Sequence, residues 1–283
     1  MLMNRTKILS ALLLLLVVFG TRSIFAQGTL MIDPKRIVFE NTKRTDVVTM
    51  YNSGNDTTTY FIGFKHFDML ENGTLLDVDS IKTKTGFSDS LFRFFPRGVK
   101  LSPHSSQAVR LQFMKPKDLA SGEYRTHLYI VEAEPKKSIG AMPSDTDKSI
   151  SLNIHALVAL AIPIIARYQT NGVTVALDNL ALSDADTAGI RMATFQMHRE
   201  GDESCYGNLL LTYKDGGGKV TVLAETKGTG IYVSLNKRIY SMKFKPPASV
   251  RIENGGTLKV EYHRAEGISK ETFLASTELA LTK

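Results

Sequence analysis

Apolar and polar residues alternate with a period of two along most of this chain, and this alternation constrains its fold more than any other feature. Side chains of a β-strand point to its two faces in turn, so the period predicts strands with one face in a core. No segment after residue 26 carries a long apolar stripe with the 3.6-residue period of a helix. The expected strands are residues 30–32, 36–39, 45–52, 58–67, 109–114, 124–133, 149–165, 173–177, 191–198, 208–213, 219–225, 230–235, 238–244, 257–263 and 272–281.

Polar segments that contain glycine separate these strands. The clearest hairpin turn is the Asp-Gly-Gly-Gly sequence at residues 215–218. Further turns are expected at residues 52–56, 71–73 and 102–106. About seven short strands in each half are typical of an immunoglobulin-like β-sandwich. We therefore predict an all-β protein of two tandem immunoglobulin-like domains, residues 27–168 and 169–283, with the boundary near residues 167–170.

The N-terminal residues have the order of an export signal. Arg5 and Lys7 precede an apolar run at residues 8–20, and a short segment ending in Ala26 follows. A positive charge, a short apolar run and small residues are typical of a cleavable secretory signal peptide. The run is shorter than the roughly 20 apolar residues of a transmembrane helix. We expect residues 1–26 to be removed and the mature protein, beginning near Gln27, to be exported and soluble.

Length, cysteine content and charge narrow the class of protein. The mature chain of about 257 residues (283 minus 26) is long enough for two domains with separate cores. The single cysteine, Cys205, excludes an internal disulfide. The formal charge of +7 falls to +4 without Arg5, Lys7 and Arg22, and this mild charge predicts no nucleic-acid partner.

The sequence contains no convincing catalytic or metal-binding motif. The six histidines are scattered, without metal-binding spacing. Cys205 is expected in a loop as an unreactive thiol, because no oriented base is evident beside it. Asp184, Asp186 and Gly189 are interpreted as a turn, since the fifth and twelfth positions of a calcium loop lack ligands. We expect no enzyme activity, cofactor, metal or small-molecule substrate, and the absence of tryptophan disfavours a carbohydrate-binding module.

The segment before residue 165 has an unusual apolar pattern. Residues 134–148 are expected to form a long flexible loop. Ile150, Leu152 and Ile154 then alternate with polar residues, and the chain becomes apolar on both faces up to Ile165. Either these aliphatic side chains pack in their own domain, or they form a free face for another chain. The residues alone favour packing in their own domain.

Three stretches of the first half resemble a known family. The opening strand has Asp33, Arg36, Val38 and Phe39, and the segment from Gly122 to Ile130 reads GEYRTHLYI. Between them, a proline-to-proline loop and the strand after it include Phe95, Pro96, Val99, Leu101, Pro103, Val109, Arg110 and Leu111. Together these stretches resemble the periplasmic pilus-assembly chaperones, the PapD-like family of two immunoglobulin-like domains set at an angle.

The resemblance implies donor-strand complementation, in which the chaperone lends an edge strand to a subunit that lacks one strand of its own sandwich. It favours a free apolar face after the long loop and makes Ile150, Leu152, Ile154 and Val158 the donor strand. The implied partners are pilus or surface-fibre subunits and an outer-membrane assembly protein. The alternative is a structural or adhesion component of the cell envelope that uses the same fold and lends no strand.

The resemblance also implies that Arg36 anchors the terminal carboxylate of the subunit in the cleft between the domains. The alternative without a binding role is that Arg36 points to solvent along its strand. In the best-known members a lysine near the end of the donor strand joins this arginine. No lysine occurs from residue 150 to residue 166 of this chain, and Arg167 is a candidate substitute.

Overall fold

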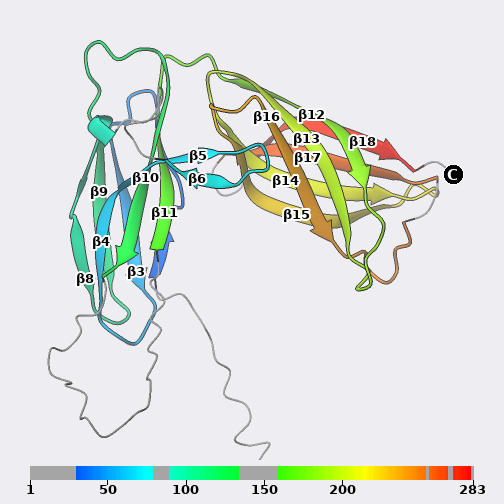
Figure 1. Cartoon of the computed structure of the whole chain (residues 1–283), viewed down its shortest axis with the longest axis horizontal. Coiled ribbons are helices and arrows are strands. Elements are labelled where there is room, and N and C mark those ends of the chain that lie inside the picture. Colours follow the sequence, from blue (N-terminus) through cyan, green and yellow to red (C-terminus); the bar gives the residue numbers. More distant parts are fainter. Residues whose placement is uncertain (1–29, 79–88, 134–158, 253–254, 267–269, 282–283) are drawn as a thin grey trace, which may run out of the picture.

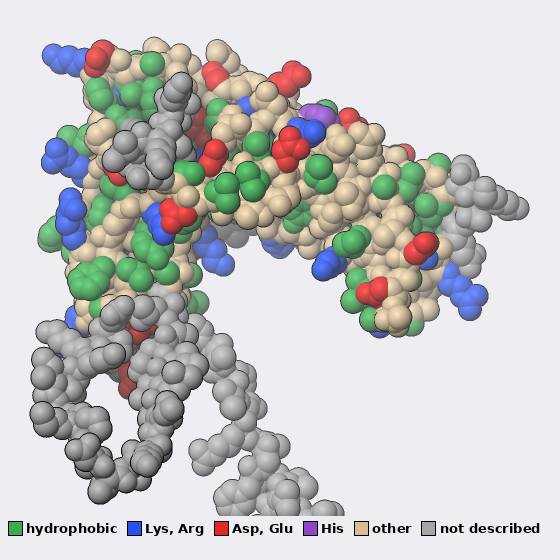
Figure 2. Space-filling view, viewed as in Figure 1, with side chains coloured by type: hydrophobic (Ala, Val, Ile, Leu, Met, Phe, Trp, Pro, Cys, Tyr) green, Lys and Arg blue, Asp and Glu red, His purple; other side chains and the backbone are tan. Residues whose placement is uncertain are grey.

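The computed structural model describes residues 30–78, 89–133, 159–252, 255–266 and 270–281. It consists of two β-sandwiches in tandem, set at an angle to each other (Figures 1 and 2). The predicted all-β fold of two immunoglobulin-like domains is confirmed. No helix in the described ranges is long and apolar enough to cross a membrane. The predicted signal peptide, residues 1–26, and the predicted donor-strand residues Ile150, Leu152, Ile154 and Val158 lie outside the described residues.

The first sandwich contains a four-stranded sheet and a five-stranded sheet. In order across the first sheet lie β1 (Leu30–Asp33), β3 (Thr45–Asn52), β9 (Ser106–Phe113) and β7 (Phe92–Phe95). In order across the second lie β2 (Ile37–Phe39), β11 (Ala159–Tyr168), β10 (Gly122–Glu132), β4 (Thr58–Lys65) and β8 (Gly98–Leu101). The chain changes sheet after β1, because β1 pairs antiparallel with β3 whereas β2 pairs in parallel with β11. Arg36 stands at this change, directly before β2.

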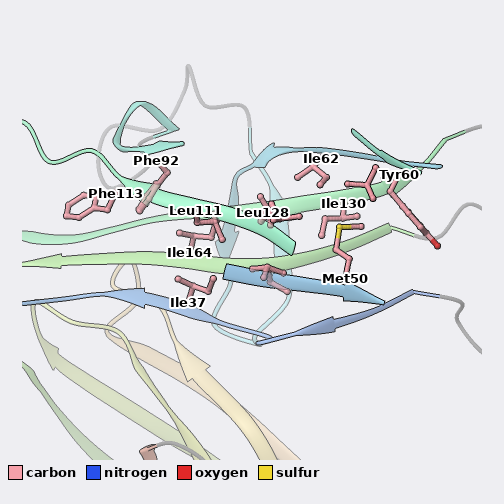
Figure 3. Close-up of a cluster of buried hydrophobic side chains, with 14 of the residues drawn as sticks. Ile37, Met50, Tyr60, Ile62, Phe92, Leu111, Phe113, Leu128, Ile130 and Ile164 are labelled. Atoms are coloured by element: carbon pink, nitrogen blue, oxygen red, sulfur yellow. The ribbon is translucent and has the colours of Figure 1, made fainter. Parts of the chain in front are cut away.

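The core of the first sandwich lies between its two sheets (Figure 3). Val48 and Met50 of β3 are buried at alternate positions, and so are Leu128 and Ile130 of β10. Burying each large aliphatic side chain stabilises the fold by roughly 1.5–3 kcal/mol. The strand predicted at residues 45–52 has the bounds of β3, since its alternation is strict.

A short hairpin extends from the first sandwich to the second (Figure 1). It is formed by β5 (Phe67–Met69) and β6 (Leu75–Asp77). The predicted strand at residues 58–67 therefore ends at Lys65, and β5 begins after the buried His66. His66 lies 2.7 Å from Asp89, which begins the 3₁₀ turn η1 (Asp89–Leu91).

The second sandwich begins at Val173 and has a sheet of three strands and a sheet of four. The first contains β12 (Val173–Leu182), β13 (Arg191–Gly201) and β16 (Lys237–Phe244), in this order. The second contains β15 (Val220–Ile231), β14 (Cys205–Lys214), β17 (Thr257–Glu266) and β18 (Lys270–Ala280). The predicted hairpin turn at residues 215–218 is present: the Gly218 amide donates to the Asp215 carbonyl at 3.0 Å. Asp186 also forms a turn, and its carboxylate accepts from the amides of Ala188 and Ile190.

Several predicted boundaries are wrong. The separate strand expected at residues 230–235 does not form, because β15 continues to Ile231 and a turn follows it. The glycine at position 228, where a break was expected, lies against Tyr206, and register shifts between β14 and β15 absorb the irregularity. Cys205 is in a strand and buried, whereas the sequence predicted a loop. The strands β6, β7 and β8, each of three or four residues, were not predicted.

Candidate functional site

A buried carboxylate joins the two sandwiches. Glu123, near the start of β10, accepts hydrogen bonds from the amide and the hydroxyl of Ser204, at 2.9 and 2.8 Å, just before β14 of the second sandwich. Arg125 donates to the same carboxylate at 2.9 Å and to the Ser204 hydroxyl at 2.6 Å. Arg167 of β11 donates to Glu123 at 3.2 Å and lies 3.2 Å from Glu203. This network ties the end of the first sandwich to the beginning of β14.

Burial alone would raise the pKa of Glu123, because it penalises the charged form. The positive charge of Arg125 and the hydrogen bonds from Ser204 and Arg125 outweigh burial and hold this pKa below its usual value. The Glu123 side chain is only 1% exposed, so its charge depends on these donors rather than on water.

The β5–β6 hairpin makes the second contact between the sandwiches. The Ile239 amide of β16 donates to the Glu71 carbonyl at 2.7 Å, and Lys237 lies 3.3 Å from the Glu71 carboxylate. The Ser234 hydroxyl donates to Asp68 at 2.6 Å. The hairpin therefore crosses the junction and is held by both backbone and side-chain contacts.

A cavity of about 220 Å³ lies between these two contacts. Three arginines line it: Arg36 and Arg125 from the first sandwich and Arg238 from β16 of the second. Tyr206 and Tyr232 also line it, and both stack with arginines. The Arg36 guanidinium lies 4.5 Å from the centre of the Tyr206 ring, and that of Arg125 lies 3.8 Å from the centre of the Tyr232 ring. We call this cavity, with Arg36, Arg125 and Arg238, the arginine cleft.

Two guanidiniums of the arginine cleft have buried nitrogens without an acceptor. The Nε atoms of Arg36 and Arg238 make no hydrogen bond within the described residues. Burial, together with the charges of Arg125 and Arg167, lowers the pKa of Arg36 to about 10. Burial likewise lowers the pKa of Arg238. Arg36 remains protonated at neutral pH, so its side chain keeps a positive charge that an anion would compensate.

The structure places Arg36 in the cleft between the sandwiches, which was one of the two predicted positions. Arg167 does not line the arginine cleft; its guanidinium is engaged by Glu123 and Glu203. Arg125 and Arg238 were not predicted. Arg125 lies within a stretch used for the family resemblance but gave no separate signal, and the position of Arg238 depends on how the sandwiches meet.

The arrangement is suited to binding an anion. Guanidinium groups hold carboxylates through pairs of charge-assisted hydrogen bonds. Cys205 also lines the arginine cleft; it is buried, and burial raises the pKa of its thiol. No group of three or more His, Cys, Asp or Glu side chains placed to hold a metal ion occurs in the described ranges.

No protein-family model and no curated protein matches the sequence. Solved structures do match the chain. One is the CsuC–CsuE chaperone–tip adhesion subunit complex from the archaic chaperone-usher Csu pili of Acinetobacter baumannii, at 12% identity over 89% of this chain and 99% of that chain, with a TM-score of 0.46. Another is the Salmonella enterica SafA pilin in complex with the SafB chaperone, at 11% identity over 90% and 97%, with a TM-score of 0.42. A third is the class 5 fimbriae chaperone CfaA, at 15% identity over 87% and 96%, with a TM-score of 0.42.

Proposed function

We propose that this protein is a periplasmic chaperone that binds pilus or surface-fibre subunits and delivers them for assembly. It lends residues 150–158 to the subunit as a strand and holds the C-terminal carboxylate of the subunit in the arginine cleft. The observation that carries the proposal is the cleft itself, where Arg36 presents a buried guanidinium nitrogen without an acceptor. A protein that only builds envelope structure has no need of an unpaired buried cation at a domain junction, because such a group is costly to bury.

The edge of β11 supports the lending of a strand. On one side β11 pairs with β10 along its whole length, but on the other side β2 pairs only with Ile164, Ile165 and Ala166. From Ala159 to Pro163 no described strand pairs with β11 on that side. An open strand edge offers backbone donors and acceptors to an added chain. Residues 150–158 lead directly into this edge.

The register of β2 connects the open edge to the arginine cleft. Because β2 is parallel to β11 and Ile37 is opposite Ile164, Arg36 stands where the open edge ends. A subunit strand added along that edge in parallel with β11 would point its C-terminus towards Arg36. A carboxylate there compensates the guanidinium and fixes the register of the added strand.

Apolar contacts would supply most of the affinity. Burying Ile150, Leu152 and Ile154 in pockets of a subunit stabilises a complex by roughly 5–9 kcal/mol before the cost of ordering the segment is subtracted. A hydrogen bond to a charged group adds roughly 1.5–3 kcal/mol. In this proposal the donor strand provides most of the binding affinity for the subunit, and Arg36 fixes the register of the added strand.

Binding of a peptide that copies the C-terminus of a subunit tests the role of Arg36. We expect Arg36→Ala to weaken binding of the free-acid peptide by about 10-fold to 100-fold, since a charge-assisted hydrogen bond is lost. Amidating the peptide should cause a similar loss with the unaltered protein. Calorimetry or fluorescence anisotropy measures both effects.

Lys35→Ala is the matched control. Lys35 is the exposed neighbour of Arg36 and lies outside the cleft, so this substitution also removes one positive charge but leaves the cleft unchanged. It should bind the free-acid peptide like the unaltered protein. Equal binding of free-acid and amidated peptides by the unaltered protein would remove the anchor role from Arg36.

A further inference from the structure

We infer that the arginine cleft selects a chain end with two negative charges, and that Arg238 binds the second of them. The ligand is a polypeptide whose last residue is acidic: Arg36 takes the α-carboxylate, and Arg238 takes the side-chain carboxylate. This inference rests on the proposed function and adds the identity of the terminal residue.

The charges around the cleft are only partly paired. Arg125 and Arg167 have carboxylate partners in Glu123 and Glu203. Neither Arg36 nor Arg238 forms an ion pair within the described residues. A single carboxylate leaves one of these two partly buried guanidiniums without a counter-charge. Two carboxylates compensate both, which is the less costly arrangement for buried cations.

Arg238 is held in place by its neighbours, although one of its guanidinium nitrogens lacks a hydrogen-bond acceptor. Its Nη1 donates to the Gly230 carbonyl of β15, and its guanidinium lies 5.0 Å from the centre of the Tyr240 ring. On the other side stands Gly73, at the turn of the β5–β6 hairpin, where an added Cβ would overlap the guanidinium. These contacts orient the group, while its Nε remains without an acceptor.

The volume of the arginine cleft fits a terminal residue together with its side chain. A water molecule occupies about 30 Å³ of liquid, and the cleft volume is about 220 Å³. The space is therefore larger than a single carboxylate group needs and accommodates the end of a chain with its side chain. Because Arg36 comes from the first sandwich and Arg238 from the second, a ligand with two carboxylates can contact both domains.

The experiment uses four peptides of one sequence that differ only at the last residue: Asp, Asn or Ala with a free carboxylate, and Asp with an amidated terminus. We expect the unaltered protein to bind the Asp free acid at least about 10-fold more tightly than the Asn free acid, since one charged contact is worth at least that factor. In Arg238→Gln this ratio should fall to about one, whereas the free-acid preference over the amide should remain.

Lys243→Gln is the matched control, because it removes one charge from an exposed position of the same strand. It should keep the preference for Asp. Arg238→Lys guards against a folding defect of the Gln variant: it retains the charge and should retain at least part of the preference. Equal binding of Asp and Asn peptides by the unaltered protein would overturn the inference about Arg238 and leave the anchor role of Arg36 intact. Equal binding of the free acid and the amide would instead remove the anchor role of Arg36 from the proposed function and leave recognition to the donor strand.

Discussion

Glu123 accepts hydrogen bonds from residues of both sandwiches, and its charge is the one that Arg125 and Arg167 share. We expect Glu123→Gln to lower the free energy of unfolding by about 3 kcal/mol, because removing one partner of a buried ion pair leaves uncompensated buried charge. Urea unfolding followed by circular dichroism measures the change. The control is Glu225→Gln, whose only ion-pair partner among the described residues, Lys227, is exposed; its effect should stay within about 0.5 kcal/mol.

The pKa of Glu123 determines how the stability difference between the unaltered protein and Glu123→Gln depends on pH. The folded-state pKa of Glu123 is lower than its ordinary value of 4.5, so its contribution is present above pH 4.5 and is lost as the pH falls through the folded-state pKa. The stability difference between the unaltered protein and Glu123→Gln should therefore shrink below pH 4.5. A difference that stays constant from pH 7 into this acidic range would show that the charge of Glu123 is not what stabilises the junction.

At the scale of elements, the β5–β6 hairpin connects the junction to the arginine cleft. Gly73 has a φ of 82°, and Gly218 in the β14–β15 turn has a φ of 88°. Alanine at either position should destabilise the protein by about 1 kcal/mol, because the left-handed region disfavours a Cβ. Only Gly73→Ala should also weaken peptide binding, since its Cβ would displace the Arg238 guanidinium, whereas a Cβ at Gly218 meets open space.

Unfolding curves and binding of the Asp-terminated peptide measure both effects on the same two variants. If Gly73→Ala binds this peptide as tightly as Gly218→Ala does, the hairpin does not position Arg238. Comparing the two variants separates backbone strain, which they share, from the contact that only Gly73 makes.

Some strands could be predicted from the sequence with their observed bounds, and others could not. The strand at residues 45–52 was predicted with its observed bounds, because alternating buried side chains such as Val48 and Met50 determine it locally. The strand expected at residues 230–235 was wrong, since Gly228 fits a close approach to Tyr206 rather than a break. The three residues of β6 are all exposed and show no alternation, and this strand forms by pairing with β5.

Only part of the arginine cleft was predictable from the sequence, because its residues come from distant parts of the chain. Arg36 was identified through a resemblance in the opening strand, which is a local pattern. Arg238 is 202 positions later in the numbering and reaches the cleft only because the hairpin and Ser204 hold the two sandwiches together. No pattern within one strand contains this information.

In the whole molecule, the two sandwiches meet at an angle (Figure 1). Residues of both sandwiches line the arginine cleft. The open edge of β11 ends beside Arg36. In our proposal a bound subunit lies along this edge and is fixed at the junction. The ionic contacts of Arg125 and Arg167 tie the sandwiches together at this junction. In the proposal, the angle between the sandwiches then sets where the end of the subunit strand stops.

In our proposal residues 150–158 capture another polypeptide, and co-purification from cells that naturally make the protein tests this capture. The tagged protein, released by osmotic shock, should carry surface-fibre subunits when it is unaltered. Leu152→Asp and Ile154→Asp should lose them, because a carboxylate would be buried without a partner in the subunit. Ser151→Asp, which alternates with these positions on the other strand face, should keep them.

Urea unfolding of the three variants without a partner should match that of the unaltered protein. We expect Leu152→Asp and Ile154→Asp to lose the subunits with unchanged unfolding, and Ser151→Asp to retain them. Subunit capture that survives Leu152→Asp and Ile154→Asp, or variants that unfold, would contradict the proposal and assign these side chains to the protein's own core.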